Sequence, residues 1–222
     1  MQNIGENINV YDNAKVYDNA ALRKNAKAFD NCNIHGDAIV DEDAIICGNA
    51  NVYGRAEIAG NANISGNTKI YDKASVHGNA QICDDAMVYG SANVYDNAQV
   101  YGNAQVYGEA ILQDYAKVYG NAKVYDEANL QDYVKVYGNA QIYGLSLIKG
   151  ITQIFGNAKI HEAYITKDVK IYGNAEISNK THIAKVGLII CGNAKFLDSV
   201  YIDNISRIKF ISGKARLKNY II

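Results

Sequence analysis

Apolar residues recur with a period of six from Asn7 to about His161. Each unit contains a small apolar residue, a polar residue and a branched aliphatic residue, as in Ala98-Gln99-Val100. The aliphatic position is Val, Ile or Leu in 25 of 26 units, and the small position is Ala in 20 of 26. Two apolar residues at i and i+2 around a polar one give the alternation of a β-strand, which branched aliphatics favour. Each unit therefore predicts a very short strand with both apolar side chains on the same side.

Each predicted strand is followed by residues that suit a tight turn. The second residue after the aliphatic is Gly or Asp in 23 of 25 units up to Gly156, and it is usually followed by Asn. These residue types tolerate positive φ and sharp corners. A chain that turns the same way every six residues, with its apolar side chains inward, winds into a tube.

The residue directly after the aliphatic shows how many strands complete one turn of the tube. Taken at every third unit, this outward position gives a set composed of Tyr and His, whereas the set beginning Arg23, Asp41, Ala59 is mixed. The segment Leu112-Gln113-Asp114-Tyr115 also returns 18 residues later. The true repeat is therefore 18 residues on three sides. This predicts an all-β protein, a single-chain triangular parallel β-helix (solenoid) of about twelve coils.

On these units the sequence resembles the hexapeptide-repeat, left-handed parallel β-helix family, with its small residue two positions before an aliphatic. The resemblance covers most of the chain and extends to uncharacterised bacterial hexapeptide proteins labelled as acyltransferases. It implies a left-handed coil, which the periodicity alone does not show. One departure is that the residue after the aliphatic is commonly small or acidic in that family and is mostly Tyr here.

The repeat divides the chain into a regular solenoid, residues 1–162, and a less regular continuation, residues 163–222. One residue is missing from the rhythm near His161–Glu162, and one extra residue is present near Lys185–Val186. The register becomes ambiguous near Ile205–Ile211. We expect Ser206–Ile222 to cap the exposed strand edges at the end of the tube or to serve as a contact segment, and a loose tail is the alternative.

The charge is nearly balanced overall but unevenly distributed. The net charge is -1, with 12 basic and 18 acidic residues in residues 1–160 and 10 basic and 5 acidic residues in residues 161–222. The net charge of the chain does not indicate nucleic acid or an anionic membrane as a partner. The sequence has no apolar run long enough to span a membrane, and its start lacks the features of a secretory signal. We therefore expect a cytoplasmic protein without membrane association.

Residues suited to catalysis are scarce. Acyl transfer in the family that the chain resembles implies a His base and an acyl-CoA donor, and this chain has four His. His35, His77 and His161 occupy Tyr positions, and His182 lies in the irregular part. If the protein is an enzyme, we expect His161 or His182 to be catalytic, because local irregularity is where a solenoid can form a pocket. The His spacing does not suit a zinc site, and we expect neither a metal nor a cofactor.

The cysteines are expected to be free thiols. Cys32 occupies an Ala position and should point inward, whereas Cys47, Cys83 and Cys191 occupy Tyr positions and should point outward. Cys47 and Cys83 share one side but lie two coils apart, about 9.6 Å, which exceeds the roughly 7 Å limit between Cα atoms for a disulfide.

A column of aromatic side chains on one side of the tube is the strongest indication of a partner. Exposed aromatic surface of this extent is typical of interfaces, although stacked Tyr rings also stabilise a sheet by themselves. The candidate interface residues, which favour a homo-oligomer or a protein partner, are Tyr17, Tyr53, Tyr71, Tyr89, Tyr107, Tyr125 and Tyr143.

The sequence thus favours a non-catalytic rod for assembly or for binding a protein partner. The alternatives are an acyltransferase-like enzyme that uses an acyl-CoA donor, and an acidic decoy or inhibitor that occupies a basic groove of its target. Stacking of sugars on the Tyr rings is a further alternative for the aromatic column.

Overall fold

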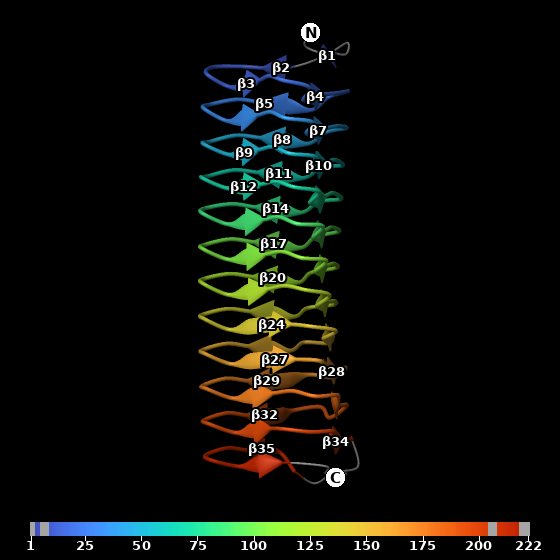
Figure 1. The fold of residues 1–222 in the computed structure, drawn as a ribbon, viewed down its shortest axis with the longest axis vertical. Helices are drawn as coiled ribbons and strands as arrows, with labels where there is room; N and C mark the ends of the chain where they lie inside the picture. Colours follow the sequence, from blue (N-terminus) through green and yellow to red (C-terminus); the bar gives the residue numbers. More distant parts are fainter. Residues whose placement is uncertain (1–2, 5–8, 204–207, 218–222) are drawn as a thin grey trace.

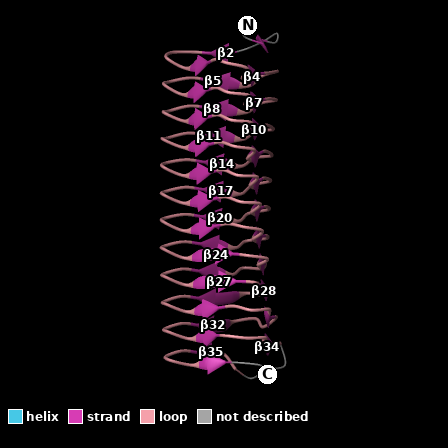
Figure 2. Ribbon diagram, viewed as in Figure 1, coloured by secondary structure: helices cyan, strands magenta, loops and turns pink. Residues whose placement is uncertain are grey.

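In the computed structural model the chain forms a straight rod of stacked coils, with β1 (Asn3–Ile4) and β35 (Phe210–Ile211) at opposite ends of the rod (Figure 1). The structure describes residues 3–4, 9–203 and 208–217, and these contain strands and turns but no helix (Figure 2). Each coil contributes one strand to each of three parallel twelve-stranded sheets, which form the three sides of the rod. The prediction of an all-β triangular parallel solenoid is confirmed. The left-handed coil stays an expectation from the sequence resemblance.

The strands are very short, most of them two residues long, and the three sheets contain the following strands. The first sheet contains β1 (Asn3–Ile4), β4 (Ala21–Leu22), β7 (Ile39–Val40), β10 (Glu57–Ile58), β13 (Ser75–Val76), β16 (Asn93–Val94), β19 (Ile111–Leu112), β22 (Asn129–Leu130), β25 (Leu147–Ile148), β28 (Ala163–Ile165), β31 (Thr181–Ile183) and β34 (Tyr201–Ile202). The second contains β2 (Asn9–Val10), β5 (Lys27–Ala28), β8 (Ile45–Ile46), β11 (Asn63–Ile64), β14 (Gln81–Ile82), β17 (Gln99–Val100), β20 (Lys117–Val118), β23 (Lys135–Val136), β26 (Gln153–Ile154), β29 (Val169–Ile171), β32 (Leu188–Ile190) and β35 (Phe210–Ile211). The third contains β3 (Lys15–Val16), β6 (Asn33–Ile34), β9 (Asn51–Val52), β12 (Lys69–Ile70), β15 (Met87–Val88), β18 (Gln105–Val106), β21 (Lys123–Val124), β24 (Gln141–Tyr143), β27 (Lys159–His161), β30 (Glu176–Ile177), β33 (Lys195–Phe196) and β36 (Arg216–Leu217).

The core is one continuous apolar column inside the rod. The Ala and aliphatic side chains are 0% exposed in coil after coil, as at Ala98 and Val100, while the polar residue between them faces outward. Parallel pairing places each strand residue beside the residue 18 positions later, so Val100 lies beside Val118. Like residues therefore stack on like residues along the whole rod, which is why the six-residue pattern is so regular.

Three changes of register follow in the C-terminal part. Leu147 pairs with Tyr164, an offset of 17, so one residue is missing at the corner that contains Glu162. Val169 pairs with Leu188, an offset of 19, so one residue is added between β31 and β32. Both irregularities lie where the sequence predicts them. A larger insertion follows, since Ile189 pairs with Phe210, an offset of 21.

The C-terminal segment continues the solenoid over its described residues. Residues 208–217 include β35 and β36, which pair in parallel with β32 and β33. Residues 208–217, which belong to the segment expected to cap the tube, therefore form part of another coil. The rest of the expected cap, residues 206–207 and 218–222, lies outside the described residues.

Carboxylates at the corners join consecutive coils. The corner residue with positive φ is Gly in some coils and Asp in others, such as Asp84 at φ 61°. Asp84 Oδ2 accepts a hydrogen bond of 2.9 Å from the backbone N–H of Gly102, the equivalent residue one coil later. Asp96 and Asp114 make the same contact to the next coil. Asp at this position therefore satisfies a corner N–H group as well as tolerating the left-handed backbone.

Amide side chains form a second kind of coil-to-coil contact. At the corner between the second and third sheets, the Asn121 side chain donates to Asn139 Oδ1 at 3.2 Å, and Asn139 donates to Asn157 Oδ1 at 3.0 Å. Such contacts make Asn a frequent residue directly after the Gly or Asp of the corner.

We predict that Thr68→Ala stabilises the protein. Thr68 occupies an Ala position, is 0% exposed, and its hydroxyl has no hydrogen-bond partner among the described residues. The free energy of unfolding should rise by about 0.5–1 kcal/mol, because relief of an unpaired buried hydroxyl outweighs the loss of one buried methyl. Urea unfolding measures the change.

Thr152→Ala is the matched control. The Thr152 hydroxyl lies 2.8 Å from the carbonyl oxygen of Lys149 and 2.7 Å from that of Lys167, so its removal should destabilise by about 1 kcal/mol. A Thr68→Ala protein less stable than the parent would show that the Thr68 hydroxyl is satisfied in solution.

Substitutions at Asp84 should separate the hydrogen bond from the backbone strain. Asp84→Ala and Asp84→Gly both remove the acceptor for Gly102 N–H, but only Ala keeps a Cβ at positive φ. The Ala variant should therefore be less stable than the Gly variant by about 1 kcal/mol in thermal or urea unfolding. Equal stabilities would mean that the corner backbone relaxes in the Ala variant.

Candidate functional site

Nine aromatic rings form one uninterrupted stack along the third sheet, which we call the tyrosine ladder. Neighbouring ring centroids lie 4.6–5.1 Å apart, and neighbouring rings are within 19° of parallel. The ladder brings together all seven tyrosines predicted from the sequence, and its members are Tyr17, His35, Tyr53, Tyr71, Tyr89, Tyr107, Tyr125, Tyr143 and His161.

The ladder presents ring edges and hydroxyl groups to the outside. Because each inner ring is stacked on both faces, as Tyr89 is on Tyr71 and Tyr107, its faces are already covered. A sugar or a base that stacks on an aromatic face would find free faces only at the ends of the ladder. The geometry thus disfavours the sugar-stacking alternative and leaves a long surface suited to edge contacts and hydrogen bonds.

Partial burial raises the pKa of five inner tyrosine hydroxyl groups of the ladder. Burial raises the pKa of Tyr53, Tyr71, Tyr89 and Tyr107 above the ordinary tyrosine value. For Tyr125, burial and then the neighbouring Tyr107 and Tyr143 raise the pKa to about 12. At neutral pH these five tyrosines therefore offer neutral hydroxyl groups that can both donate and accept hydrogen bonds.

Charged side chains border the ladder on both sides. Lys69 precedes Tyr71 by two residues and lies on one side of it, and Asp72 follows Tyr71 at the corner on the other side. Lys123, Tyr125 and Asp126 repeat this arrangement three coils later.

The other two sheets differ from the third. The second sheet carries a shorter ladder of five rings, which are Tyr101, Tyr119, Tyr137, Phe155 and Tyr172. The first sheet has one stacked pair, His77 and Tyr95, at the same outward position. The third sheet is therefore the side with the longest aromatic surface.

The two candidate catalytic histidines lie on different sides of the rod. His161 ends β27 of the third sheet, where it stacks on Tyr143 and its Nε2 lies 3.7 Å from a Glu162 carboxylate oxygen. His182 lies in β31 of the first sheet, with its ring edge-on to Tyr201 at 4.8 Å between centroids. The fold does not bring the two residues into one site.

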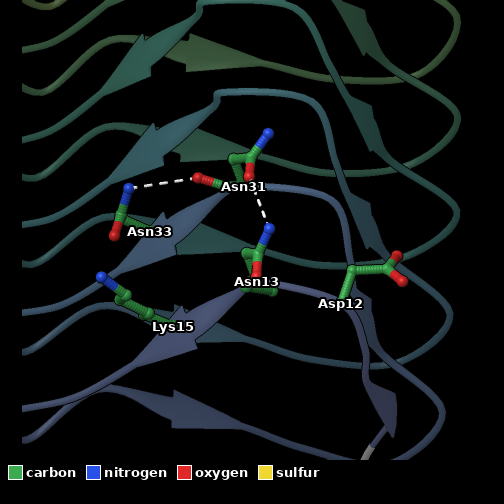
Figure 3. A pocket seen from close by; sticks show the side chains of 6 residues that line it. Asp12, Asn13, Lys15, Asn31 and Asn33 are labelled. Carbon is green, nitrogen blue, oxygen red and sulfur yellow. Dashed lines mark hydrogen bonds between the residues drawn. The ribbon is translucent and has the colours of Figure 1, made fainter.

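The recesses in the surface are open, and they differ in lining: the first below is mainly polar and the second mainly apolar. One, of about 420 Å³, is lined by Asp12, Asn13, Ala14, Lys15, Asn31 and Asn33. In it Asn13 donates to Asn31 at 3.1 Å, and Asp12 points away from Lys15 (Figure 3). Another, of about 220 Å³, lies beside Ile151 and Asp168. Among the described residues no group of three or more His, Cys, Asp or Glu is placed to hold a metal ion.

The four cysteines are free thiols, as expected, but Cys191 is less exposed than its outward position suggests. Cys32 is buried and Cys47 and Cys83 are half-buried, whereas Cys191 is buried although it occupies an outward position. Its thiol interacts with the Tyr172 hydroxyl of the preceding coil, and this contact raises the pKa of Tyr172.

The comparison with protein families concerns the middle of the rod. A family model described as the YdcK Beta solenoid repeat matches residues 80–96 and 98–114. Over these residues the chain is similar to that repeat. The two matched segments begin 18 residues apart, which is one coil of the rod. The match supports a β-solenoid repeat protein and does not single out acyltransferases. The comparison with curated proteins finds no match.

Two exposed tyrosines outside the ladder were not expected from the repeat. Tyr115 and Tyr133 are 47% and 53% exposed and stack on each other at the corner between the first and second sheets, where Asn61, Asn79 and Asn97 occupy the same position in the three preceding coils. The signal is visible in the sequence as Tyr in place of Asn at the start of two units.

In the described residues no helix is long and apolar enough to cross a membrane.

The raised tyrosine pKa values predict a loss of stability in alkali. The folded state holds the phenol protons more tightly than the unfolded chain, whose tyrosines titrate near pH 10. The stabilising contribution should be complete below about pH 10 and should be lost as the pH rises through the folded pKa, which is about 12 for Tyr125. Tyrosinate absorbance and circular dichroism, recorded together against pH, measure both effects. A single titration near pH 10 with unchanged stability would contradict the partial burial of the ladder.

Proposed function

We propose that the protein is a rigid, non-catalytic rod that acts in assembly, and that the tyrosine ladder is the surface through which it associates. The observation that carries the proposal is the ladder itself, which runs without interruption over nine coils from Tyr17 to His161. Stabilising one sheet would not require this length, since in the described residues the second sheet has a shorter ladder and the first has one stacked pair.

The dimensions of the ladder face suit a protein interface. Nine coils at about 4.8 Å span roughly 38 Å, and the five residues across the face span roughly 15 Å. Two such faces in contact would bury on the order of 1,100 Å², which is near the lower limit for a specific complex. A flat face that runs straight along a rod can also meet an identical face over its whole length, so self-association is the simplest form.

The sequence-based alternatives gain no specific support. An acyltransferase needs a pocket that holds its donor beside a base, but His161 and His182 lie on different sheets and neither lines a recess described above. An acidic decoy needs its carboxylates gathered on one surface, whereas the corner carboxylates Asp84, Asp96 and Asp126 are on three different corners.

Tyr89→Ser combined with Tyr107→Ser tests the proposal. Removal of two central rings should weaken self-association at least tenfold, since central aromatic residues dominate the energy of interfaces. Sedimentation equilibrium over a range of concentrations measures the dissociation constant, and circular dichroism checks that the coil is retained.

Tyr119→Ser combined with Tyr137→Ser is the matched control, because these rings are stacked in the same way on the second sheet. This control variant should associate like the parent protein. A parent protein that stays monomeric at high concentration, or equal weakening by both pairs of substitutions, would refute the tyrosine ladder as the interface.

A further inference from the structure

The charges beside the tyrosine ladder follow a rule that the neighbouring sheets do not. In nine coils of the third sheet, the outward residue two positions before the ladder ring is Lys in four and neutral in five. The corner residue directly after the ring is acidic in the same four coils and Gly in the other five. The four coils are Lys15/Asp18, Lys69/Asp72, Lys123/Asp126 and Lys159/Glu162.

The second sheet shows that this match is not a general property of the repeat. There Lys27 has an acidic residue, Asp30, at the corner three positions later. The corner residue three positions after Lys117, Lys135 and Lys170 is Gly in each case. Conversely, the neutral Gln81 has the acidic Asp84 at its corner. A requirement of the coil itself would couple lysine and carboxylate on every side. The coupling is confined to the side that carries the long ladder.

The paired charges do not neutralise each other within the chain. None of the ion pairs found in the described part of the chain includes Lys15, Lys69, Lys123 or Lys159. One oxygen each of Asp18, Asp72 and Asp126 accepts a backbone N–H of the next coil, at 3.2 Å in each case. These three carboxylates are exposed, as are Lys15, Lys69 and Lys159, while Lys123 is half-buried.

The order of these groups across the face is lysine, aromatic ring, carboxylate. The strand runs across the rod from the lysine to the corner, so the four lysines form one row and the four acidic residues form another, with the ladder between them. We call these the lysine row and the carboxylate row. The face is therefore positive along one border and negative along the other.

Resting on the proposed function, we propose that the ladder face binds the same face of a second copy with the two rods parallel. A two-fold axis along the rods places every coil opposite the same coil of the second copy and exchanges the two borders of the face. Each lysine row then lies opposite the carboxylate row of the other copy, in all four charged coils. An antiparallel arrangement would place lysine opposite lysine and carboxylate opposite carboxylate, which is unfavourable.

The spacing of the charges fits this arrangement. Lys15, Lys69 and Lys123 are separated by three coils, about 14 Å, and Lys159 lies two coils, about 9.6 Å, from Lys123. Both spacings exceed the Debye length of roughly 8 Å at physiological salt. Repulsion within each row is therefore small, whereas opposite charges across the interface would be in direct contact. The neutral ladder hydroxyls would meet along the centre and hydrogen-bond to one another.

Reversal of the lysine row tests the charge pattern. Lys15→Glu, Lys69→Glu, Lys123→Glu and Lys159→Glu together make both borders acidic and should weaken self-association of the full chain at least tenfold. The matched control is Lys27→Glu, Lys117→Glu, Lys135→Glu and Lys170→Glu, which changes the net charge equally at the same strand position of the second sheet. The control should associate like the parent protein.

A complementary variant should restore the contact. Asp18→Lys, Asp72→Lys, Asp126→Lys and Glu162→Lys together make both borders basic, and Lys24 and Lys180 show that lysine can hold positive φ at such corners. Each variant alone should be monomeric, and an equal mixture should form a one-to-one complex in sedimentation equilibrium. A mixture that stays monomeric while both variants keep their fold would overturn the proposed charge contacts.

A single cysteine on the ladder determines the orientation. Tyr53→Cys, in a background with Cys47→Ser and Cys83→Ser, should form a disulfide-linked dimer on mild oxidation, because residue 53 faces itself in the parallel pair. Disulfides that form only when this variant is mixed with Tyr125→Cys would show an antiparallel pair and overturn the proposal while leaving the ladder as the interface. A parent protein that does not self-associate would overturn both proposals.

Discussion

The in-register stacking of 18-residue coils is the constraint on which the rest of the structure depends. Parallel pairing places each residue beside its equivalent one coil later, as Gln99 and Val100 lie beside Lys117 and Val118. The spacing of about 4.8 Å between neighbouring strands then applies to every column of side chains. Columns of aliphatic residues make the core, columns of amides make hydrogen-bonded chains, and columns of aromatic rings make stacks.

The same constraint limits where a function can be located. Inward positions are committed to the core, and the corner positions must accept positive φ and bond to the next coil. Only the outward strand positions, and the corner residues with spare polar atoms, can differ between sides without disturbing the coil. Tyr71 with Lys69 and Asp72 is such a set, since two of these side chains are outward and the carboxylate also serves the backbone of the next coil.

Much of the fold follows from the sequence because its signals are local and repeated many times. The 18-residue coil, the missing residue near Glu162 and the added one near Val186 all follow from counting along the chain, and the structure agrees. The tyrosine column follows too, because stacking is a direct consequence of the register.

Other features of the molecule cannot be predicted from the sequence, because they depend on how side chains of neighbouring coils lie in space. The acceptor role of Asp84 depends on where the N–H of Gly102 points in the next coil. The burial of Cys191 and its contact with the Tyr172 side chain do not follow from the alternation of inward and outward positions. The sequence contains the coupling of lysine and carboxylate beside the ladder. That this coupling gives the ladder face one positive and one negative border follows only from the direction in which the strands cross the rod.

Hydroxyl-radical footprinting of the parent protein at low and high concentration tests the central claim, that the ladder face is the surface of association, most directly. Oxidation of Tyr71, Tyr89 and Tyr107 should fall as the concentration rises, while oxidation of Tyr119 and Tyr137 on the second sheet should stay constant. Protection of the second-sheet rings instead, or no protection of either ladder in a sample that has associated, would contradict it.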